Sequence, residues 1–540
     1  MHLNRRRFIR DAMVAGAVLA AWRMPLGARV ADTEVRVAGS DFPWLEATID
    51  QLQATMARGE LTAVALTQAY LERIAAIDQA GPTLRAVIEV NPEALAIAAE
   101  ADRERAAGRV HGPLHGIPVL VKDNIDTADR MRTTAGSLAL LEAKPARDAT
   151  VVARLRAGGA VLLGKTNLSE WANFRSTRSI SGWSGRGGQT RNPYALDRNP
   201  SGSSSGSAAA VAANLCAVAV GTETDGSIVS PASVCGLVGV KPTVGLISRA
   251  GIIPISASQD TAGPMARTVK DAALLLGVLA SADARDAATQ ARPADLPTDF
   301  TTGLGQPALS GARLGIFRGG MALNPKTEAV LADAIAALRA AGAEIVDPVE
   351  VAGMKELGDA EFEVLLYEFK DGLNAYFATL GPAAPIRSLE QLIAFNRAHA
   401  DREMPYFGQE LLEQAQAKGP LTEQAYLDAL ATCRRLARAE GIDAALASHR
   451  LDALVTLTNG PAWPIDPVSG DSYTGGSSSL AAVAGYPSVT VPAGQIMGLP
   501  VGLSFTGKAW SELRLLQLAA DFERRTAART PPQFLPSVKW

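Results

Sequence analysis

Cysteine is scarce in this sequence. Three cysteines occur in 540 residues, and none of them is part of a C-x-x-C motif: Cys216, Cys235 and Cys433. An odd number of cysteines without that motif argues against a disulfide framework. Two of the three lie in a small, apolar central stretch, so we predict buried free thiols.

Histidine is also scarce, with five residues in the chain. There is no H-E-x-x-H motif and no cluster of cysteine and histidine, so we expect no catalytic metal. His111 and His115 are four residues apart, but Gly112 and Pro113 between them prevent the helix that would place both side chains on one face. We therefore expect no metal at this pair either.

The sequence also has no large excess of positive or negative charge. Lys and Arg total 52 against 55 for Asp and Glu, a net charge of -3, and there is no basic stripe with interleaved aromatic residues. This pattern argues against nucleic-acid binding. Hydrophobic residues make up 47% and charged residues 20%, which excludes a disordered or collagen-like chain. The length is compatible with one large α/β domain or with two domains.

The N-terminal apolar run is too short to span a bilayer as a stable helix. It extends from Ala12 to Trp22 and follows the basic segment Asn4-Arg-Arg-Arg-Phe-Ile-Arg10. This arrangement is typical of an export signal, and the paired arginines before Phe8 resemble a twin-arginine signal. We therefore predict a signal peptide over residues 1–31, a periplasmic or secreted location and no stable membrane anchor. An uncleaved amphipathic tail is the alternative.

From about Asp41 onward, segments with apolar residues at helical spacing alternate with short apolar runs. The run Ile117–Val121 is a continuous apolar strand that ends at Lys122. This alternation predicts an α/β fold with a buried, mostly parallel sheet. Further helices are predicted within 45–78 and at 149–156, 269–279, 327–341, 361–377 and 423–447, and further strands at 84–90, 160–163, 313–317, 453–457, 488–491 and 501–505. Residues 293–306 are the most linker-like segment.

Two motif matches are better explained structurally. Residues 159–166 fit the G-x-x-x-x-G-K-T phosphate loop, but their variable positions are Ala, Val, Leu and Leu, which predict a buried strand. Residues 202–206 fit the G-x-S-x-G elbow with Ser204 as nucleophile. That elbow must follow a strand directly, whereas residues 192–200 contain two Asn-Pro pairs typical of turns. We expect neither nucleotide binding nor such an elbow.

The most informative stretch runs from Asn199 to Val240. A turn rich in glycine and serine, 201–207, and a second polar turn, 222–227, bracket an alanine-rich helical run and an apolar strand-like run. Because small residues leave the backbone accessible, N–H groups in such turns can approach a reacting atom and stabilise an anionic transition state.

A serine nucleophile in these turns needs a base. A lysine can serve if burial lowers its pKa, and Lys122 ends an apolar strand where such burial is expected. The alternatives are that Lys122 reaches solvent and that Ser203 and Ser227 are ordinary turn and cap residues.

Several motifs in order resemble those of the amidase signature family. They are His115-Gly-Ile-Pro-Val-Leu-Val-Lys122-Asp-Asn, Gly164-Lys-Thr-Asn-Leu-Ser-Glu170, Arg191-Asn-Pro-Tyr, Ser201-Gly-Ser-Ser-Ser-Gly-Ser-Ala-Ala-Ala and Gly221-Thr-Glu-Thr-Asp-Gly-Ser227-Ile with Pro231-Ala232. Within that family the chain is similar to bacterial members that act on peptide amides, from about Pro43 to Pro536.

The resemblance implies a fold and a catalytic triad. The fold is α/β, a single large domain over residues 41–540 with a mixed central β-sheet covered by helices. By motif position Ser227 is the nucleophile, Ser203 is the bridging serine after a cis peptide bond, and Lys122 is the base. The oxyanion hole is formed by the backbone N–H groups of Thr224, Asp225, Gly226 and Ser227. No metal or organic cofactor is required.

The chain departs from the family pattern at two positions. Asp225 stands where many members have glycine, which predicts a narrower oxyanion hole or an unusual backbone conformation. Val229 stands where many members have arginine, so a substrate carboxylate has no obvious partner. The second departure favours a neutral, larger substrate such as the amidated end of a peptide.

The predicted function is a serine amidase that removes the C-terminal amide of peptides and releases ammonia. A monomer acting on small-molecule or peptide amides is expected. The alternatives are a general amidase for small aryl or alkyl amides, an amidotransferase-type subunit that delivers ammonia, and a non-catalytic exported binding protein. Aromatic residues beside the motifs are candidates for the pocket walls and are equally compatible with the core: Trp171, Phe174, Trp183, Tyr367 and Trp463.

Overall fold

The computed structural model describes residues 42–319, 324–381 and 384–538. The predicted signal peptide, residues 1–31, lies outside the described residues. The linker-like segment 293–306 does not divide the described chain, which forms one unit from residue 42 onward. The prediction of a single large α/β domain is therefore confirmed.

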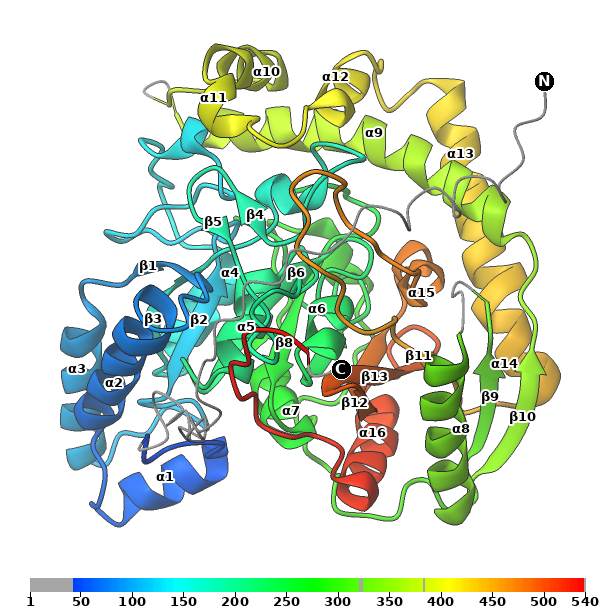
Figure 1. The fold of residues 1–540 in the computed structure, drawn as a ribbon, viewed down its shortest axis with the longest axis horizontal. Coiled ribbons are helices and arrows are strands. Elements are labelled where there is room, and N and C mark those ends of the chain that lie inside the picture. The colour runs from blue at the N-terminus through cyan, green and yellow to red at the C-terminus, as the bar shows by residue number, and fades with distance from the viewer. Residues whose placement is uncertain (1–41, 320–323, 382–383, 539–540) are drawn as a thin grey trace, which may run out of the picture. The chain divides into compact units, whose positions relative to one another are not determined.

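A mixed sheet forms the centre of this unit (Figure 1). Within the described residues it has eleven strands in the order β1-β3-β2-β6-β8-β7-β12-β13-β11-β9-β10, and β4 and β5 form a separate pair. The strands are β1 (Val87–Val90), β2 (Pro118–Lys122), β3 (Val161–Thr166), β4 (Trp183–Ser184), β5 (Gly188–Gln189), β6 (Val218–Glu223), β7 (Val238–Lys241), β8 (Thr261–Ala266), β9 (Arg313–Phe317), β10 (Glu344–Val349), β11 (Ala453–Leu457), β12 (Ser488–Ile496) and β13 (Leu499–Thr506).

Strand direction differs from the expectation drawn from alternating helices and strands. Among the described residues, four of the ten pairings in this sheet are parallel, so the prediction of a mostly parallel sheet is wrong. One cause is the hairpin of β12 and β13, which turns at Met497 and Gly498, both with positive φ. A two-residue turn permits only antiparallel pairing, because parallel neighbours need a crossover.

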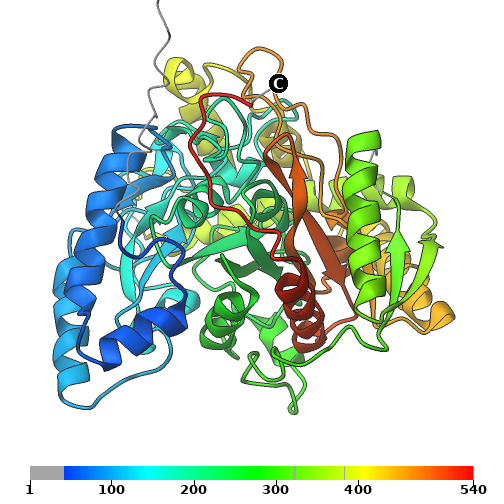
Figure 2. The ribbon, with the colours of Figure 1, turned by 60° about the horizontal axis from the view of Figure 1, so that its bottom comes forward.

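Helices cover the sheet. α7 packs against β8, α8 and α16 pack against β12, α5 packs against β6, and α6 packs against β7; Figure 2 shows α8 and α16 beside the β12–β13 hairpin. The helices are α1 (Ile49–Ala57), α2 (Ala63–Arg73), α3 (Ala94–Ala106), α4 (Thr150–Ala157), α5 (Ser205–Ala212), α6 (Val229–Val234), α7 (Val269–Leu279), α8 (Pro325–Ala340), α9 (Met354–Thr379), α10 (Leu389–Ala398), α11 (Ala400–Glu403), α12 (Glu410–Gln416), α13 (Gln424–Arg434), α14 (Asp443–His449), α15 (Ser478–Ala484) and α16 (Glu512–Thr526). None of these described helices has the length and hydrophobicity needed to cross a membrane.

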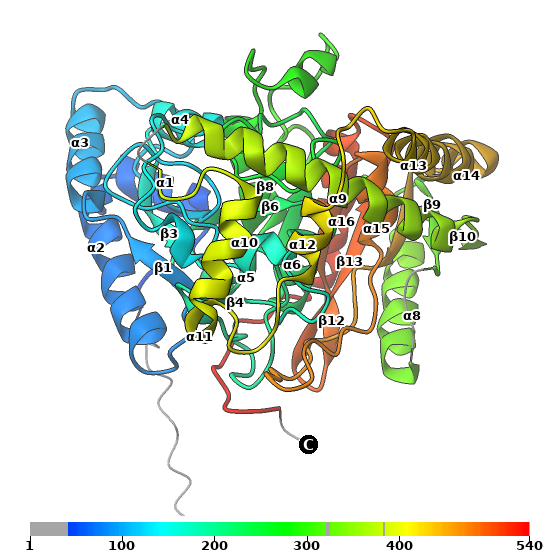
Figure 3. The same ribbon diagram turned by 90° about the horizontal axis from the view of Figure 1, so that it is seen from above.

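The helices α9 to α14 form one excursion between β10 and β11. Both of these strands pair with β9, so the excursion leaves and rejoins the sheet at positions separated by one strand. Figure 3 shows α9, α10 and α12 together, and α12 and α13 both pack against α9. An apolar cluster that includes Trp171, Phe174, Phe369 and Phe377 joins this excursion to the loop after β3.

Candidate active site

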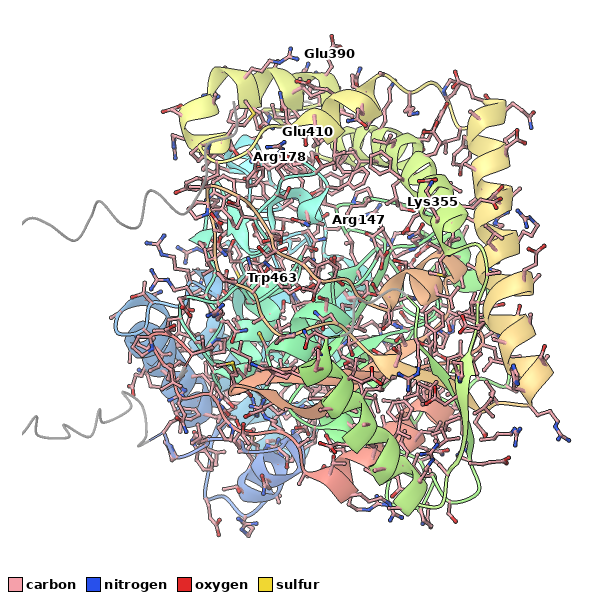
Figure 4. The ribbon with its side chains drawn as sticks, turned by 45° about the vertical axis from the view of Figure 1, so that its right-hand side comes forward. Arg147, Arg178, Lys355, Glu390, Glu410 and Trp463 are labelled. Atoms are coloured by element: carbon pink, nitrogen blue, oxygen red, sulfur yellow. The ribbon has the colours of Figure 1, made fainter. Side chains whose placement is uncertain are left out.

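The two serine-bearing turns meet at a cavity of about 610 Å³. Residues Thr224 to Ser227 line it, and α9 contributes Met354 and Leu365 to its wall. The loop between β11 and α15 forms another part of the wall, and Figure 4 labels Trp463 on this loop.

Hydrogen bonds connect one part of the cavity wall to α12. Ser176 and Thr177 line the cavity, and both donate hydrogen bonds to Glu410 Oε1, at 2.8 and 2.9 Å through their hydroxyl groups. The next residue is Arg178, which Figure 4 shows close to Glu410. The cavity therefore lies between sheet-borne turns and the excursion.

The first serine-rich turn is held by its own small side chains. The peptide bond between Gly202 and Ser203 is cis, and Ser205 Oγ donates to the Ser201 carbonyl at 2.6 Å. A Cβ at Gly202 would clash with Ser169 Oγ, so only glycine fits there. The helix α5 begins directly after the turn. As the Asn-Pro pairs indicate, no strand precedes Ser204, whose Oγ donates to the Thr222 carbonyl at 3.0 Å.

Lys122 reaches this turn from the end of β2. Its side chain is fully buried, and Nζ lies 2.8 Å from Ser203 Oγ and 3.0 Å from Ser204 Oγ. Thr222, at the end of β6, places its Oγ1 at 2.9 Å and its carbonyl oxygen at 3.2 Å from the same nitrogen. The alternative that Lys122 reaches solvent is excluded.

Burial lowers the pKa of Lys122 to about 7, although the charges of Asp260 and Glu223 act in the opposite direction. An ammonium ion loses its hydration in a buried position, and hydroxyl groups replace only part of it. A substantial fraction of the amine is therefore neutral near pH 7 and able to accept a proton.

The second turn presents unpaired backbone donors. Within the described residues, the N–H groups of Asp225, Gly226 and Ser227 have no hydrogen-bond acceptor. Gly226 has a φ of +77°, and a Cβ there would lie 2.8 Å from Ser478 Oγ, so this position requires glycine. Glu223 Oε2 fixes the far side of the turn by accepting from the N–H groups of Ile228 and Val229, at 2.7 and 3.0 Å.

Asp225 fits this turn without an unusual backbone conformation, because it is not among the described non-glycine residues with positive φ. The left-handed position is taken by Gly226 instead. The Asp225 side chain turns to neighbouring groups, and its Oδ2 accepts from Ser479 Oγ at 2.6 Å.

Two of the five aromatic candidates line the cavity, namely Phe174 and Trp463. Trp171 is buried against Phe377, with ring centroids 6.2 Å apart, and belongs to the apolar cluster below the excursion.

Neither Trp183 nor Tyr367 is part of the described cavity wall. Trp183 packs against Phe407 and the Arg175 guanidinium, at 5.2 Å in both contacts. The Tyr367 hydroxyl donates to Glu423 Oε2 at 2.6 Å. Large aromatic side chains near a motif thus serve the packing of the excursion as often as the cavity.

One polar residue of the cavity wall had no sequence signal. Asp471 lines the cavity and accepts from the Trp463 indole at 3.0 Å, from Asn199 Nδ2 at 3.1 Å and from Ser181 Oγ at 2.6 Å. These three donors come from separate stretches of the chain. An aspartate in a loop without periodicity gives no indication of such convergence.

A third side chain of a metal-ligating type, that of Glu104, lies close to the histidine pair. Ligand-type atoms of Glu104, His111 and His115 lie within 4.8 Å of one another. His115 Nε2 contacts the Ala101 carbonyl at 2.9 Å, and its Nδ1 is buried without a hydrogen-bond partner among the described residues. His111 Nε2 lies 3.1 Å from Glu104 Oε1, so these two side chains already pair with each other.

These features define an amide-cleaving enzyme class, and the sequence places the chain in it. The family model described as Amidase matches residues 65–516, so the chain belongs to the amidase family. It is a hydrolase that acts on amide carbon–nitrogen bonds.

Individual relatives refine this assignment. The chain is 43% identical over 512 residues to a probable amidase of Arabidopsis thaliana, covering 93% of this chain and 94% of the relative. It is 37% identical over 482 residues to a glutamyl-tRNA(Gln) amidotransferase subunit of Symbiobacterium thermophilum, covering 87% and 94%. The X-ray structure of native peptide amidase from Stenotrophomonas maltophilia superposes with a TM-score of 0.87 at 57% identity, covering 91% of this chain and 99% of that one.

Proposed function

We propose that the protein hydrolyses the C-terminal amide of peptides through a triad of Ser227, Ser203 and Lys122. The observation that carries the proposal is the contact of 2.8 Å between buried Lys122 Nζ and Ser203 Oγ, beside a cavity lined by Ser227. A buried amine next to a hydroxyl can act as a general base if it is neutral.

The hydrogen bonds around Lys122 favour proton transfer from Ser203. A neutral amine has two N–H donors and one lone pair. The Thr222 carbonyl can only accept, and Ser204 Oγ directs its own proton to that carbonyl, so these two oxygens take the donors. The lone pair then faces two hydroxyl groups, Ser203 Oγ at 2.8 Å and Thr222 Oγ1 at 2.9 Å. We assign it to the Ser203 hydroxyl, which in turn takes the proton of Ser227 as that residue attacks the amide carbonyl.

The unpaired N–H groups of Asp225, Gly226 and Ser227 support an oxyanion hole at the second turn. Donors of this kind contribute roughly 3 kcal/mol each to the stability of a tetrahedral intermediate. Thr224 lines the cavity beside them and completes the proposed set. Ammonia then leaves with the proton returned through Ser203, and water cleaves the acyl enzyme by the same relay.

The peptide end of the substrate is proposed from the shape and chemistry of the cavity. Phe174 and Trp463 offer apolar surface for a peptide chain, whereas Val229 is buried and is not part of the described cavity wall. The similarity to a peptide amidase across nearly the whole chain supports the same substrate class. No metal or cofactor is part of the proposed reaction.

The test is the release of ammonia from an amidated dipeptide, compared with the free dipeptide and with small aryl and alkyl amides. The wild-type protein should release ammonia from the amidated dipeptide, and Ser227→Ala should lower kcat by roughly 10⁴-fold or more. Ser227→Ala activity within about tenfold of wild type, a barrier difference of about 1.4 kcal/mol, would contradict the mechanism. Equal rates on small amides would favour a general amidase instead.

A second candidate function is supported by the relation to an amidotransferase component. Such a component would pass its ammonia to a partner enzyme. Co-purification with a stable partner, together with ammonia release that depends on that partner, would favour this function over an independent amidase. The same assays detect a non-catalytic binding protein, which would bind the amide without releasing ammonia.

We also propose export to the periplasm or medium, on the basis of the N-terminal sequence alone. Fractionation of cells that express the full chain tests this, with the two arginines before Phe8 changed to lysine as the comparison. Retention of that variant in the cytoplasm is the expected result, and equal export of both forms would contradict a twin-arginine route.

A further inference from the structure

The cavity carries negative charge without a balancing cation. Asp225 and Asp471 line it, whereas no described lysine, arginine or histidine does so. The Asp471 oxygens are occupied by the donors of Ser181, Asn199 and Trp463. Asp225 has a different environment, because its Oδ1 is buried and has no hydrogen-bond partner among the described residues.

A neighbouring carboxyl group is that of Glu361 on α9, whose pKa responds to the charge of Asp225. Glu361 is buried, and its Oε1 accepts from Gln259 Nε2 at 2.8 Å. Gln259 Nε2 also donates to the Thr224 carbonyl at 3.2 Å. Asp225 is therefore connected to the rest of its own turn through Glu361 and Gln259.

Two carboxyl groups that lie close together in a buried position disfavour a charge on both. Burial and the charge of Asp225 raise the pKa of Glu361 well above its usual range. Asp225 is the member of the pair that lines the cavity, two residues from Ser227.

The geometry points to Asp225 as a specificity-determining residue that rejects substrates with a carboxylate next to the scissile amide, with Glu361 as the positioning residue that holds it. This inference rests on the proposed function and adds the charge of the accepted substrate. Amides of residues with neutral or cationic side chains are the accepted class. Amides of acidic residues are rejected, and so are side-chain amides of a C-terminal asparagine or glutamine, which carry a free carboxylate.

The physical basis is repulsion between like charges in a cavity that offers no cation. A juxtaposed pair of like charges at a binding interface strongly disfavours the complex, and such repulsion is a common source of specificity.

The test uses two peptides of nearly equal shape, N-acetyl-Ala-Gln-NH2 and N-acetyl-Ala-Glu-NH2, with the products separated by chromatography at pH 7.5. The wild-type protein should prefer the glutamine peptide by roughly 100-fold in kcat/KM. Asp225→Asn should reduce this preference to roughly fivefold or less, because the variant keeps the shape and removes the charge. An unchanged preference in Asp225→Asn would overturn the inference.

Three further variants separate charge from packing. Glu361→Gln is a neutral donor and acceptor like protonated Glu361, so it should retain the preference, whereas Glu361→Leu should weaken it. Asp471→Asn removes the other carboxylate of the cavity and should leave most of the preference. Loss of the preference in Asp471→Asn alone, or equal behaviour of the two Glu361 variants, would overturn the assignment. Thermal unfolding of each variant identifies any that fail to fold.

Calorimetric binding of the two peptides to Ser227→Ala measures the preference between them in the absence of turnover. If Ser227→Ala prefers the glutamine peptide but the wild-type protein hydrolyses neither peptide, the proposed function fails and the inference stands. If the wild-type protein hydrolyses both at equal kcat/KM, the inference fails and the proposed function stands. If Ser227→Ala binds neither peptide, both the proposed function and the inference fail.

Discussion

Lys122 and Lys165 lie at the ends of adjacent parallel strands and differ in what they touch. In the register of β2 and β3, Lys122 is opposite Thr166 and Lys165 is opposite Val121. Because side chains alternate along a strand, the two lysines project to opposite faces of the sheet. Both are fully buried, and burial lowers the pKa of each.

The partners decide the use of each lysine. Lys122 Nζ meets the hydroxyl groups of Ser203, Ser204 and Thr222 beside the cavity. Lys165 Nζ donates to the Ile125 carbonyl at 2.6 Å and to Thr133 Oγ1 at 2.9 Å, and the charges of Asp123 and Asp126 oppose the lowering of its pKa. A buried lysine is thus a candidate base only where a nucleophile and a cavity lie on its side of the sheet.

The largest expected effect separates the two lysines directly. Lys122→Met should lower kcat by roughly 10³-fold or more, because the proposed base is lost. Lys165→Met should keep kcat within about threefold and lower the free energy of unfolding by about 2 kcal/mol, because buried oxygens lose their donor. Ammonia release and urea unfolding of both variants measure this. A comparable loss of kcat in both would erase the distinction.

An intermediate effect is expected for the two serines that contact Lys122. Ser203→Ala should lower kcat by roughly 10³-fold, because the proposed proton path is interrupted. Ser204→Ala should lower kcat by about tenfold at most and cost about 1 kcal/mol of stability, because Ser204 Oγ mainly holds the Thr222 backbone. A larger loss in Ser204→Ala than in Ser203→Ala would reassign the proton path.

The smallest effect concerns pH. With the pKa of Lys122 at about 7, kcat/KM should fall about tenfold per pH unit below pH 7, because the protonated amine cannot accept a proton. Thr222→Val should move this limb to lower pH by about 0.5 unit, because Thr222 Oγ1 stabilises the ammonium form. Thr166→Val is the control, since its hydroxyl bonds to Ser207 and not to Lys122. If the acidic limb of the pH profile is unchanged in Thr222→Val, the limb does not report the protonation of Lys122.

Much of the fold follows from periodicity. The predicted bounds of α7, β9 and β11 agree with the structure residue for residue, and residues 161–166 form a buried strand where the phosphate-loop motif matched. In contrast, β8 was not predicted, because its sequence Thr-Ala-Gly-Pro-Met-Ala has one β-branched residue, no aromatic residue, and both a glycine and a proline, which are depleted in strands. Its place between β6 and β7 is set by tertiary pairing.

The site was predictable only where family motifs cover it. Lys122 and Lys165 follow similar apolar runs, Val-Leu-Val-Lys-Asp-Asn and Leu-Leu-Gly-Lys-Thr-Asn, and the residues alone do not say which one reaches the serines. The apolar strand before Lys122 made it a candidate, and the resemblance assigned it as the base. Glu361 and Asp471 lie outside those motifs, and their positions depend on how the excursion and the loop after β11 pack against the second turn.

The excursion from Met354 to His449 has an evolutionary consequence. Because it leaves and rejoins the sheet at strands that share β9 as a neighbour, its length and sequence can diverge without shifting the register of any strand. It supplies Met354 and Leu365 to the cavity and Glu361 behind it, but none of the proposed triad. Recombination of this one segment among relatives is therefore a direct route to new substrate ranges on an inherited reaction centre.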